Sequence, residues 1–104
     1  MALIYYRYVG EEEKRSIEKK NLICSSSGAT YFTPDRYDSA DEAQKKLSLL
    51  QLPVWRIGGI AEEDMPELDR STLRVVAPLN GQPGGGKECT ASRPVRWFPF
   101  YRLG

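Results

Sequence analysis

The chain has 104 residues, of which 15 are lysine or arginine and 14 are aspartate or glutamate, so its formal charge is +1. This length supports one domain with a single core, and the balanced charge leads us to expect neither a membrane nor a nucleic acid as a direct partner. Histidine is absent, which excludes Ser-His-Asp and Cys-His triads, histidine-containing zinc enzymes and histidine-dependent nucleases.

Targeting signals and metal-binding patterns are also missing from the sequence. No segment approaches the roughly 18 consecutive apolar residues of a membrane span, and the first residues lack the basic and long apolar regions of a secretory signal. Cys24 and Cys89 are too few and too far apart in sequence to predict a disulfide framework or a zinc site. We interpret both as reduced thiols of a cytosolic protein and expect no metal.

The N-terminal part of the chain predicts a strand, a helix and a second strand. Residues 3–9 are aromatic and β-branched, which predicts a buried strand with one charge, Arg7. Residues 11–20 are polar and helix-forming, which predicts a short surface helix. Residues 30–33 predict a short strand that ends at Pro34.

The rest of the chain adds one more helix and several strands. Residues 39–42 have the form of a capping box, which predicts a helix whose apolar positions continue to Leu50. Strands are predicted over 54–57, 73–77, 88–92 and 95–101, with an acidic loop or helical turn over 62–68. Strands outnumber helices without alternating regularly, so we predict an α+β fold with mixed or antiparallel sheets and two or three short helices.

Arg7 and a group of aromatic residues are the first candidates for function. A guanidinium fork suits phosphate or carboxylate, although a salt bridge across the sheet is the alternative for Arg7. Tyr31, Phe32 and Tyr37 bracket a short strand and the loop after it, where they could hold a planar ring. Packing in the core is the alternative for these aromatic residues.

Glu88 is the third candidate, because it follows a loop with four glycines over residues 81–87. Glycine tolerates positive φ and lets the backbone approach a ligand closely, and Glu88 is predicted at the junction of this loop with a strand. The Lys-Ser/Thr pair of a nucleoside-triphosphate loop is missing, so we do not predict that activity. An exposed rim charge is the alternative for Glu88.

Arginine, aromatic rings and glutamate together suit cleavage of an N-glycosidic bond. When a heterocycle leaves a ribose, an oxocarbenium-like centre forms, and a nearby carboxylate stabilises it as in glycoside hydrolysis. The arginine would hold a diphosphate and the aromatic residues would hold the leaving ring. None of these roles requires histidine.

Three segments in chain order resemble the C-terminal ADP-ribosyltransferase toxins of Rhs polymorphic proteins. They are residues 5–10 (YYRYVG), 30–40 (TYFTPDRYDSA) and 81–88 (GQPGGGKE). The resemblance covers nearly the whole chain and implies an ADP-ribosyltransferase-like fold over residues 1–104, with NAD as a substrate and Glu88 as the catalytic residue. The NAD-binding residues that it implies are Arg7, Tyr31, Phe32, Thr33, Tyr37 and Ser39. The serines at 25–27 precede the strand, so we place the family's strand motif at residues 31–33.

The chain departs from the family pattern two residues before Glu88. Many members carry glutamate or glutamine there, where it selects or activates the acceptor, whereas this chain has Gly86. This departure argues against an arginine acceptor. The glycine turn is similar to the loop that recognises the protein target in such toxins, and a flexible hairpin is the alternative. The implied target-recognition residues are Gln82, Gly84, Gly85, Gly86 and Lys87.

The resemblance implies a mono-ADP-ribosyltransferase toxin that blocks protein synthesis by modifying a protein of the translation machinery, with elongation factor Tu as the expected target. It also implies an excised C-terminal part of a larger Rhs protein, which a type VI secretion apparatus delivers into the cytoplasm of a target bacterium, and a cognate immunity protein. Three alternatives stay open: an NAD glycohydrolase on the same fold, a non-catalytic binding module and a histidine-free ribonuclease toxin.

Overall fold

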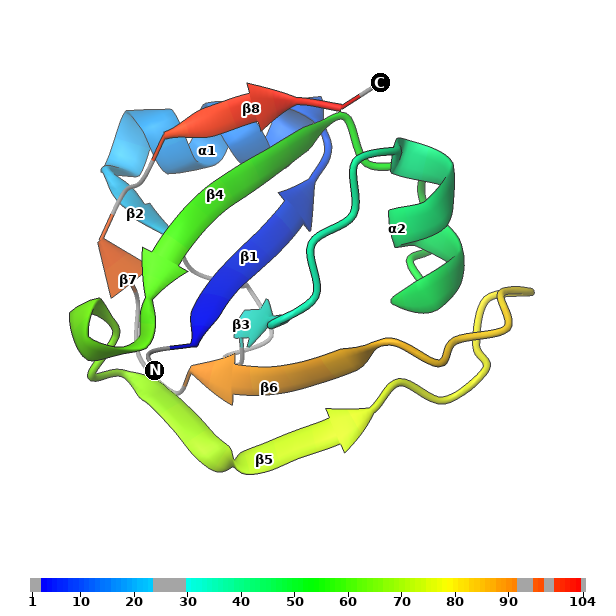
Figure 1. The fold of residues 1–104 in the computed structure, drawn as a ribbon. Coiled ribbons are helices and arrows are strands. Elements are labelled where there is room, and N and C mark those ends of the chain that lie inside the picture. The colour runs from blue at the N-terminus through cyan, green and yellow to red at the C-terminus, as the bar shows by residue number, and fades with distance from the viewer. Residues whose placement is uncertain (1–2, 24–29, 92–94, 97–98, 104) are drawn as a thin grey trace.

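The computed structural model describes residues 3–23, 30–91, 95–96 and 99–103, and Figure 1 shows their arrangement. In chain order the elements are β1 (Ile4–Val9), α1 (Glu11–Lys20), β2 (Leu22–Ile23), β3 (Thr30–Phe32), α2 (Ala40–Lys46), β4 (Trp55–Ala61), the 3-10 helix η1 (Glu62–Asp64), β5 (Leu68–Val75), β6 (Lys87–Ala91), β7 (Val95–Arg96) and β8 (Phe100–Arg102). The strand pairs are antiparallel, which confirms the predicted α+β class.

Two three-stranded sheets form the body of the protein, in the orders β1-β4-β8 and β3-β6-β5. Where β1 meets β3, the backbones of Tyr6 and Thr33 exchange two hydrogen bonds of 2.8 and 2.9 Å. Figure 1 accordingly shows β3 between the start of β1 and β6. β3 therefore connects β1, the first strand of the chain, with β6, the strand that follows the glycine loop.

The main core lies between α1 and the β1-β4-β8 sheet. It contains Tyr5, Ile17 and Ile57 together with Phe32 and Cys89 of the second sheet. Ile17 is the one buried residue of α1, as its isolated apolar position predicts. Acidic residues in the first turn of α1 and basic residues in the last turn complement the helix dipole.

A smaller cluster supports α2 on the other side of β1. Tyr8, Tyr37 and Ala43 are buried there, with Leu47 and Leu49 packed against them. Ser39 caps the helix, since its Oγ accepts a hydrogen bond of 3.1 Å from the backbone of Glu42. Within the described residues, neither helix is long and apolar enough to cross a membrane.

Several boundaries differ from the prediction. The second helix ends at Lys46, and Ser48 beyond it adopts a left-handed φ of 51°. Leu50, which the helical period assigns to the apolar face, is 74% exposed. β4 and β5 are longer than predicted, and β2 was not predicted. The region predicted as one strand over 95–101 contributes β7 to a pair with β2 and β8 to a pair with β4.

Candidate active site

Five of the predicted site residues line one pocket at the junction of the two sheets. β1 supplies Arg7, β3 and the residue after it supply Tyr31, Phe32 and Thr33, and β6 supplies Glu88. The β1-β3 junction and the pairing of Phe32 with Cys89 set the relative positions of these strands. The pocket therefore gathers side chains that are as much as 81 positions apart in the sequence, since 88 − 7 = 81.

The pocket continues into a wider cleft of about 550 Å³. Arg7, Tyr31 and Glu88 line both parts. The outer wall is the chain from Val75 to Leu79, where the side chains of these two residues are 62% and 64% exposed. This volume falls within the roughly 300–1,000 Å³ of small-molecule sites.

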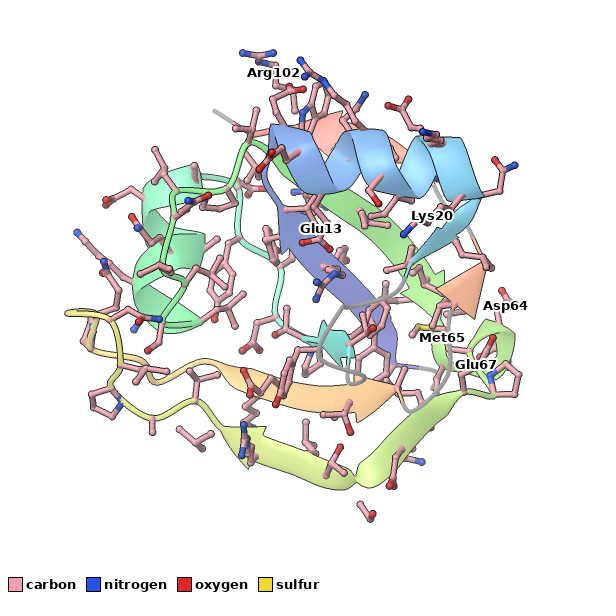
Figure 2. The ribbon with its side chains drawn as sticks, turned by 180° about the vertical axis from the view of Figure 1, so that it is seen from behind. Glu13, Lys20, Asp64, Met65, Glu67 and Arg102 are labelled. Carbon is pink, nitrogen blue, oxygen red and sulfur yellow. The ribbon has the colours of Figure 1, made fainter. Side chains whose placement is uncertain are left out.

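Arg7 is held by α1 and β3. Its Nε donates to Glu13 Oε2 at 2.8 Å, a second guanidinium nitrogen lies 2.6 Å from the same oxygen, and a third donates to the carbonyl of Tyr31 at 2.8 Å. Figure 2 shows Glu13 reaching from α1 toward β1. The predicted alternative for Arg7 is a salt bridge across the sheet; the structure instead shows an ion pair with Glu13 on the neighbouring helix α1.

Glu88 faces an arginine across β5 and β6. Arg74 lies opposite it in the strand register, and the Nε and one terminal nitrogen of Arg74 donate to Glu88 Oε2 at 3.2 and 2.9 Å. The hydrogen bond to Glu88 is the main cause that raises the pKa of Arg74 above its usual value. Because Arg74 is 63% exposed while Glu88 is 14% exposed, the arginine covers the carboxylate from the solvent side.

Asp35 fixes the first residue of β6 directly before Glu88. Its Oδ2 accepts a hydrogen bond of 2.8 Å from the backbone of Lys87 and one of 3.2 Å from the hydroxyl of Tyr37. Its own backbone N–H donates to Thr33 Oγ1 at 3.0 Å. The turn after β3 thus reaches across the sheet and sets where the Glu88 side chain begins.

The glycine loop is docked on the end of α2. The backbone N–H groups of Gly84 and Gly86 donate to the last helix carbonyls, those of Lys45 and Lys46, at 2.9 and 3.0 Å. Helix ends leave such carbonyls without partners inside the helix, so the loop acts as a cap. Gly84 and Gly86 are buried by this contact.

The other predicted loop residues differ in exposure. Gly85 and Lys87 are exposed and Gln82 is partly exposed. The backbones of Leu79 and Gln82 exchange hydrogen bonds of 2.9 and 3.1 Å, so the loop tip is itself a closed turn. Only the exposed positions offer side chains or backbone to another molecule.

Gly86 has no space for a side chain. A Cβ atom there would lie 2.5 Å from the hydroxyl of Tyr37, 3.0 Å from the carbonyl oxygen of Lys46 and 3.3 Å from a methyl group of Leu47. A glutamate or glutamine, which many of the toxins that the sequence resembles carry at this position, does not fit against α2 as it is placed here. The departure noted in the sequence is thus matched by the packing around it.

Two predicted NAD-binding residues lie outside the pocket. Tyr37 is buried in the smaller cluster, where burial raises the pKa of its hydroxyl above the usual value. Ser39 caps α2. The serines at 25–27 lie outside the described residues.

The sequence alone did not identify three polar neighbours of the predicted set: Glu13, Asp35 and Arg74. The signal for Glu13 was its place on the face of an amphipathic helix that follows β1 directly. The pairing of β5 with β6 is irregular between Asp69 and Arg74. The position of Arg74 opposite Glu88 could therefore not be deduced from the sequence spacing of the two residues. Within the described part of the chain, no group of three acidic or cysteine side chains is arranged to hold a metal ion.

Comparisons with known proteins found no relative. No family model matches the sequence, no curated protein matches it, and no solved structure matches its fold.

Proposed function

We propose that this domain is an NAD-dependent mono-ADP-ribosyltransferase with Glu88 as its catalytic carboxylate. The observation that supports this proposal is that Arg7, Tyr31 and Glu88 line one cleft although they come from separate strands. An arginine fork, an aromatic ring and a carboxylate are the groups that N-glycosidic cleavage of a dinucleotide needs.

In the proposed reaction the bond between ribose C1′ and the nicotinamide nitrogen breaks, and its electron pair leaves with nicotinamide. The carboxylate of Glu88 stabilises the positive charge that develops on the ribose. A nucleophilic atom of the acceptor then forms the new bond to C1′ and loses its proton. Arg7 binds the diphosphate, and Tyr31 packs against the leaving ring.

Each arginine of the cleft forms an ion pair with a carboxylate, and bound NAD must replace these ion pairs. Glu13 competes with a diphosphate for Arg7, and Arg74 competes with the ribose for Glu88. Arg74 is largely exposed, and ion pairs of exposed side chains are weak and screened by salt. Arg74 can therefore turn from Glu88 to the diphosphate when NAD enters, which frees the carboxylate.

The proposed acceptor is a protein of the translation machinery, with elongation factor Tu as the first candidate. This part of the proposal rests on the sequence resemblance, in particular to the type VI effector TreTu. The same resemblance supports delivery as part of a larger Rhs protein into the cytoplasm of a target bacterium and protection of the producer by an immunity protein.

The decisive experiment incubates the domain with labelled NAD and a bacterial lysate and identifies the labelled species. Glu88→Gln keeps the shape of the side chain but removes its charge, and we expect transfer to fall by about 10²–10³-fold. Glu18→Gln, which removes an exposed carboxylate from α1, is the matched control and should transfer normally. Near-normal transfer by a folded Glu88→Gln protein would refute the role of Glu88.

Arg7 and Glu13 give an independent test of the substrate-binding half. Arg7→Ala should raise the Michaelis constant for NAD, because the diphosphate loses its cation. Glu13→Gln should lower that constant, because it removes the anion that competes for Arg7. An unchanged Michaelis constant in both variants would contradict the placement of NAD against β1.

NAD glycohydrolase activity is the second candidate, and Gly86 is the observation that favours it. Without a side chain at this position, the chain lacks the group that activates an acceptor in many family members, so water can take the acceptor's place. Release of free ADP-ribose at the full rate without any protein would favour this activity. Failure to bind or consume NAD would favour a non-catalytic binding module.

A further inference from the structure

A second cavity, of about 450 Å³, lies on the face of the β1-β4-β8 sheet that is opposite α1. Arg56 pairs in register with Tyr8 and Tyr101, whereas its neighbour Trp55 contacts Lys14 of α1. Successive side chains of a strand point to opposite faces, so Arg56 and Tyr101 point away from α1. In Figure 1 α1 lies behind this sheet, so the face opposite α1 is the one turned toward the viewer.

Two glycines of β4 line this cavity. Gly58 and Gly59 form an irregularity in the register opposite Tyr6, and Gly59 adopts a φ of +55° that L side chains rarely take. A Cβ atom at Gly58 would lie 2.5 Å from a ring carbon of Tyr101. The tyrosine ring therefore lies directly against the strand backbone at Gly58.

Arg56 lies at the side of the cavity between two aromatic rings. The centre of its guanidinium is 5.8 Å from the ring of Tyr6 and 5.6 Å from the ring of Tyr101, and its side chain is only 13% exposed. One terminal nitrogen donates to Asp38, but the buried Nε has no hydrogen-bond partner among the described residues. Arg56 therefore has more donor capacity than the protein satisfies, and an unsatisfied buried donor is costly.

Among the described residues, Asp38 is the one carboxylate that lies between Arg36 and Arg56. Its Oδ1 accepts from Arg36 Nε at 3.2 Å and from a terminal nitrogen of Arg56 at 3.1 Å. The Asp38 and Arg36 side chains are 79% and 60% exposed. Two cations share one carboxylate, so the cluster keeps a charge of 2 − 1 = +1, and a carboxylate this exposed is easily exchanged.

We propose that this cavity is a second binding site, which takes a phosphorylated planar ligand of mononucleotide size. The phosphate replaces the Asp38 carboxylate between Arg36 and Arg56, and the ring packs against Tyr101, which is 52% exposed. Arginine forks match phosphate geometry, exposed tyrosine rings stack on planar groups, and the volume lies in the small-molecule range. The proposal is independent of transferase activity, because Glu88 is absent from this cavity.

The first test titrates the whole chain with AMP, adenosine and inorganic phosphate, followed by calorimetry and by NMR of backbone amides. We expect AMP to bind more tightly than adenosine or inorganic phosphate alone. AMP should also change the NMR chemical shifts of the backbone amides of Gly58, Gly59 and Tyr101. Absence of saturable AMP binding at millimolar concentrations would overturn the proposal. So would shifts confined to Tyr31 and Glu88, or inorganic phosphate that binds as tightly as AMP.

Replacement of Asp38 tests whether its carboxylate competes with the phosphate of AMP. A purely structural ion pair would not predict tighter AMP binding after this replacement. Asp38→Ala should tighten AMP binding by up to about fivefold, because the phosphate no longer competes with a carboxylate. Asp41→Ala makes the same charge change on α2, where Asp41 pairs with Lys45, and should leave AMP binding unchanged. Equal affinities in the two variants would refute the competition.

Arg36 and Arg102 provide the matched pair of cation variants. Arg36→Gln should weaken AMP binding by about fivefold, since the phosphate loses one exposed cation. Arg102 is also exposed but lies over Trp55 on the α1 side of the sheet, and Figure 2 shows it above α1. Arg102→Gln should therefore bind AMP normally. An equal loss of AMP affinity in both variants would mean that only the overall charge matters, and it would refute the proposed site.

Discussion

Replacement of Gly86 by alanine tests whether the glycine loop is docked on α2. The new methyl carbon would lie 2.5 Å from the hydroxyl of Tyr37 and 3.0 Å from the carbonyl oxygen of Lys46. Neither neighbour moves freely, because Tyr37 is buried and donates to Asp35, and the Lys46 carbonyl accepts the N–H of residue 86 itself. Overpacking of this kind lowers the free energy of unfolding by about 1–3 kcal/mol.

Thermal unfolding followed by circular dichroism measures this loss. For a domain of this size each kcal/mol changes Tm by about 4–8 °C, so we expect Gly86→Ala to lower Tm by roughly 4–24 °C. Gly10→Ala is the matched control, because nothing lies within 4 Å of a Cβ at that position and its φ is −85°. Its effect should stay within about 0.5 kcal/mol.

A double-mutant cycle with Tyr37→Phe identifies the clash. Tyr37→Phe removes the atom closest to the added methyl group, so the double variant should be more stable than the sum of the single losses predicts, by about 0.5–2 kcal/mol. An unchanged Tm in Gly86→Ala, or strict additivity with Tyr37→Phe, would refute the docked loop and with it the explanation for the missing side chain before Glu88.

Tyr8→Phe should lower the free energy of unfolding by about 1–3 kcal/mol in urea, because the Tyr8 hydroxyl accepts the buried N–H of Tyr37 at 2.6 Å. Thr72→Val should cost about 1–3 kcal/mol because Thr72 Oγ1 accepts the backbone N–H of Thr90 at 2.8 Å, while Thr72→Ser should keep most of the stability. Burial raises the pKa of Cys89 from 9.0 to about 11. The unfolded chain therefore loses this proton first, and the urea midpoint should fall between pH 9 and 11 in the wild type, with a smaller fall in Cys89→Ala.

The fold could be predicted where local sequence and tertiary packing agree. α1 has its predicted bounds because its charges complement the helix dipole and Asn21 takes the left-handed conformation at its end. α2 is shorter than its apolar period indicates, since the carbonyls of its last turn bind the amides of Gly84 and Gly86. That contact joins segments about 40 residues apart, and no local pattern contains it.

The sequence predicts some residues of the candidate site but not their ion-pair partners. Residue type and family resemblance predict a shared site for Arg7, Tyr31 and Glu88, and the fold brings these three residues to one cleft. Their roles with NAD stay predictions. Their ion-pair partners were not predicted. Arg74 meets Glu88 only because β5 carries additional residues against β6 before this pair, and an irregular register of this kind has no period in the sequence.

Besides Arg74 on the paired strand β5, two contacts from other parts of the chain help to place Glu88. Asp35 holds the N–H of Lys87, and α2 holds the N–H of Gly86, so the two residues before Glu88 are tied to different parts of the chain. The packing that ties Gly86 to α2 also excludes a side chain there. Any group that activates an acceptor must therefore come from elsewhere, and the exposed wall from Val75 to Leu79 is the part of the cleft that an acceptor protein would meet first. Under the proposed function, a change that loosens the end of α2 should accordingly impair the catalytic step assigned to Glu88 before it affects NAD binding at Arg7, because the hydrogen bonds of Arg7 that the structure describes go to Glu13 of α1 and Tyr31 of β3.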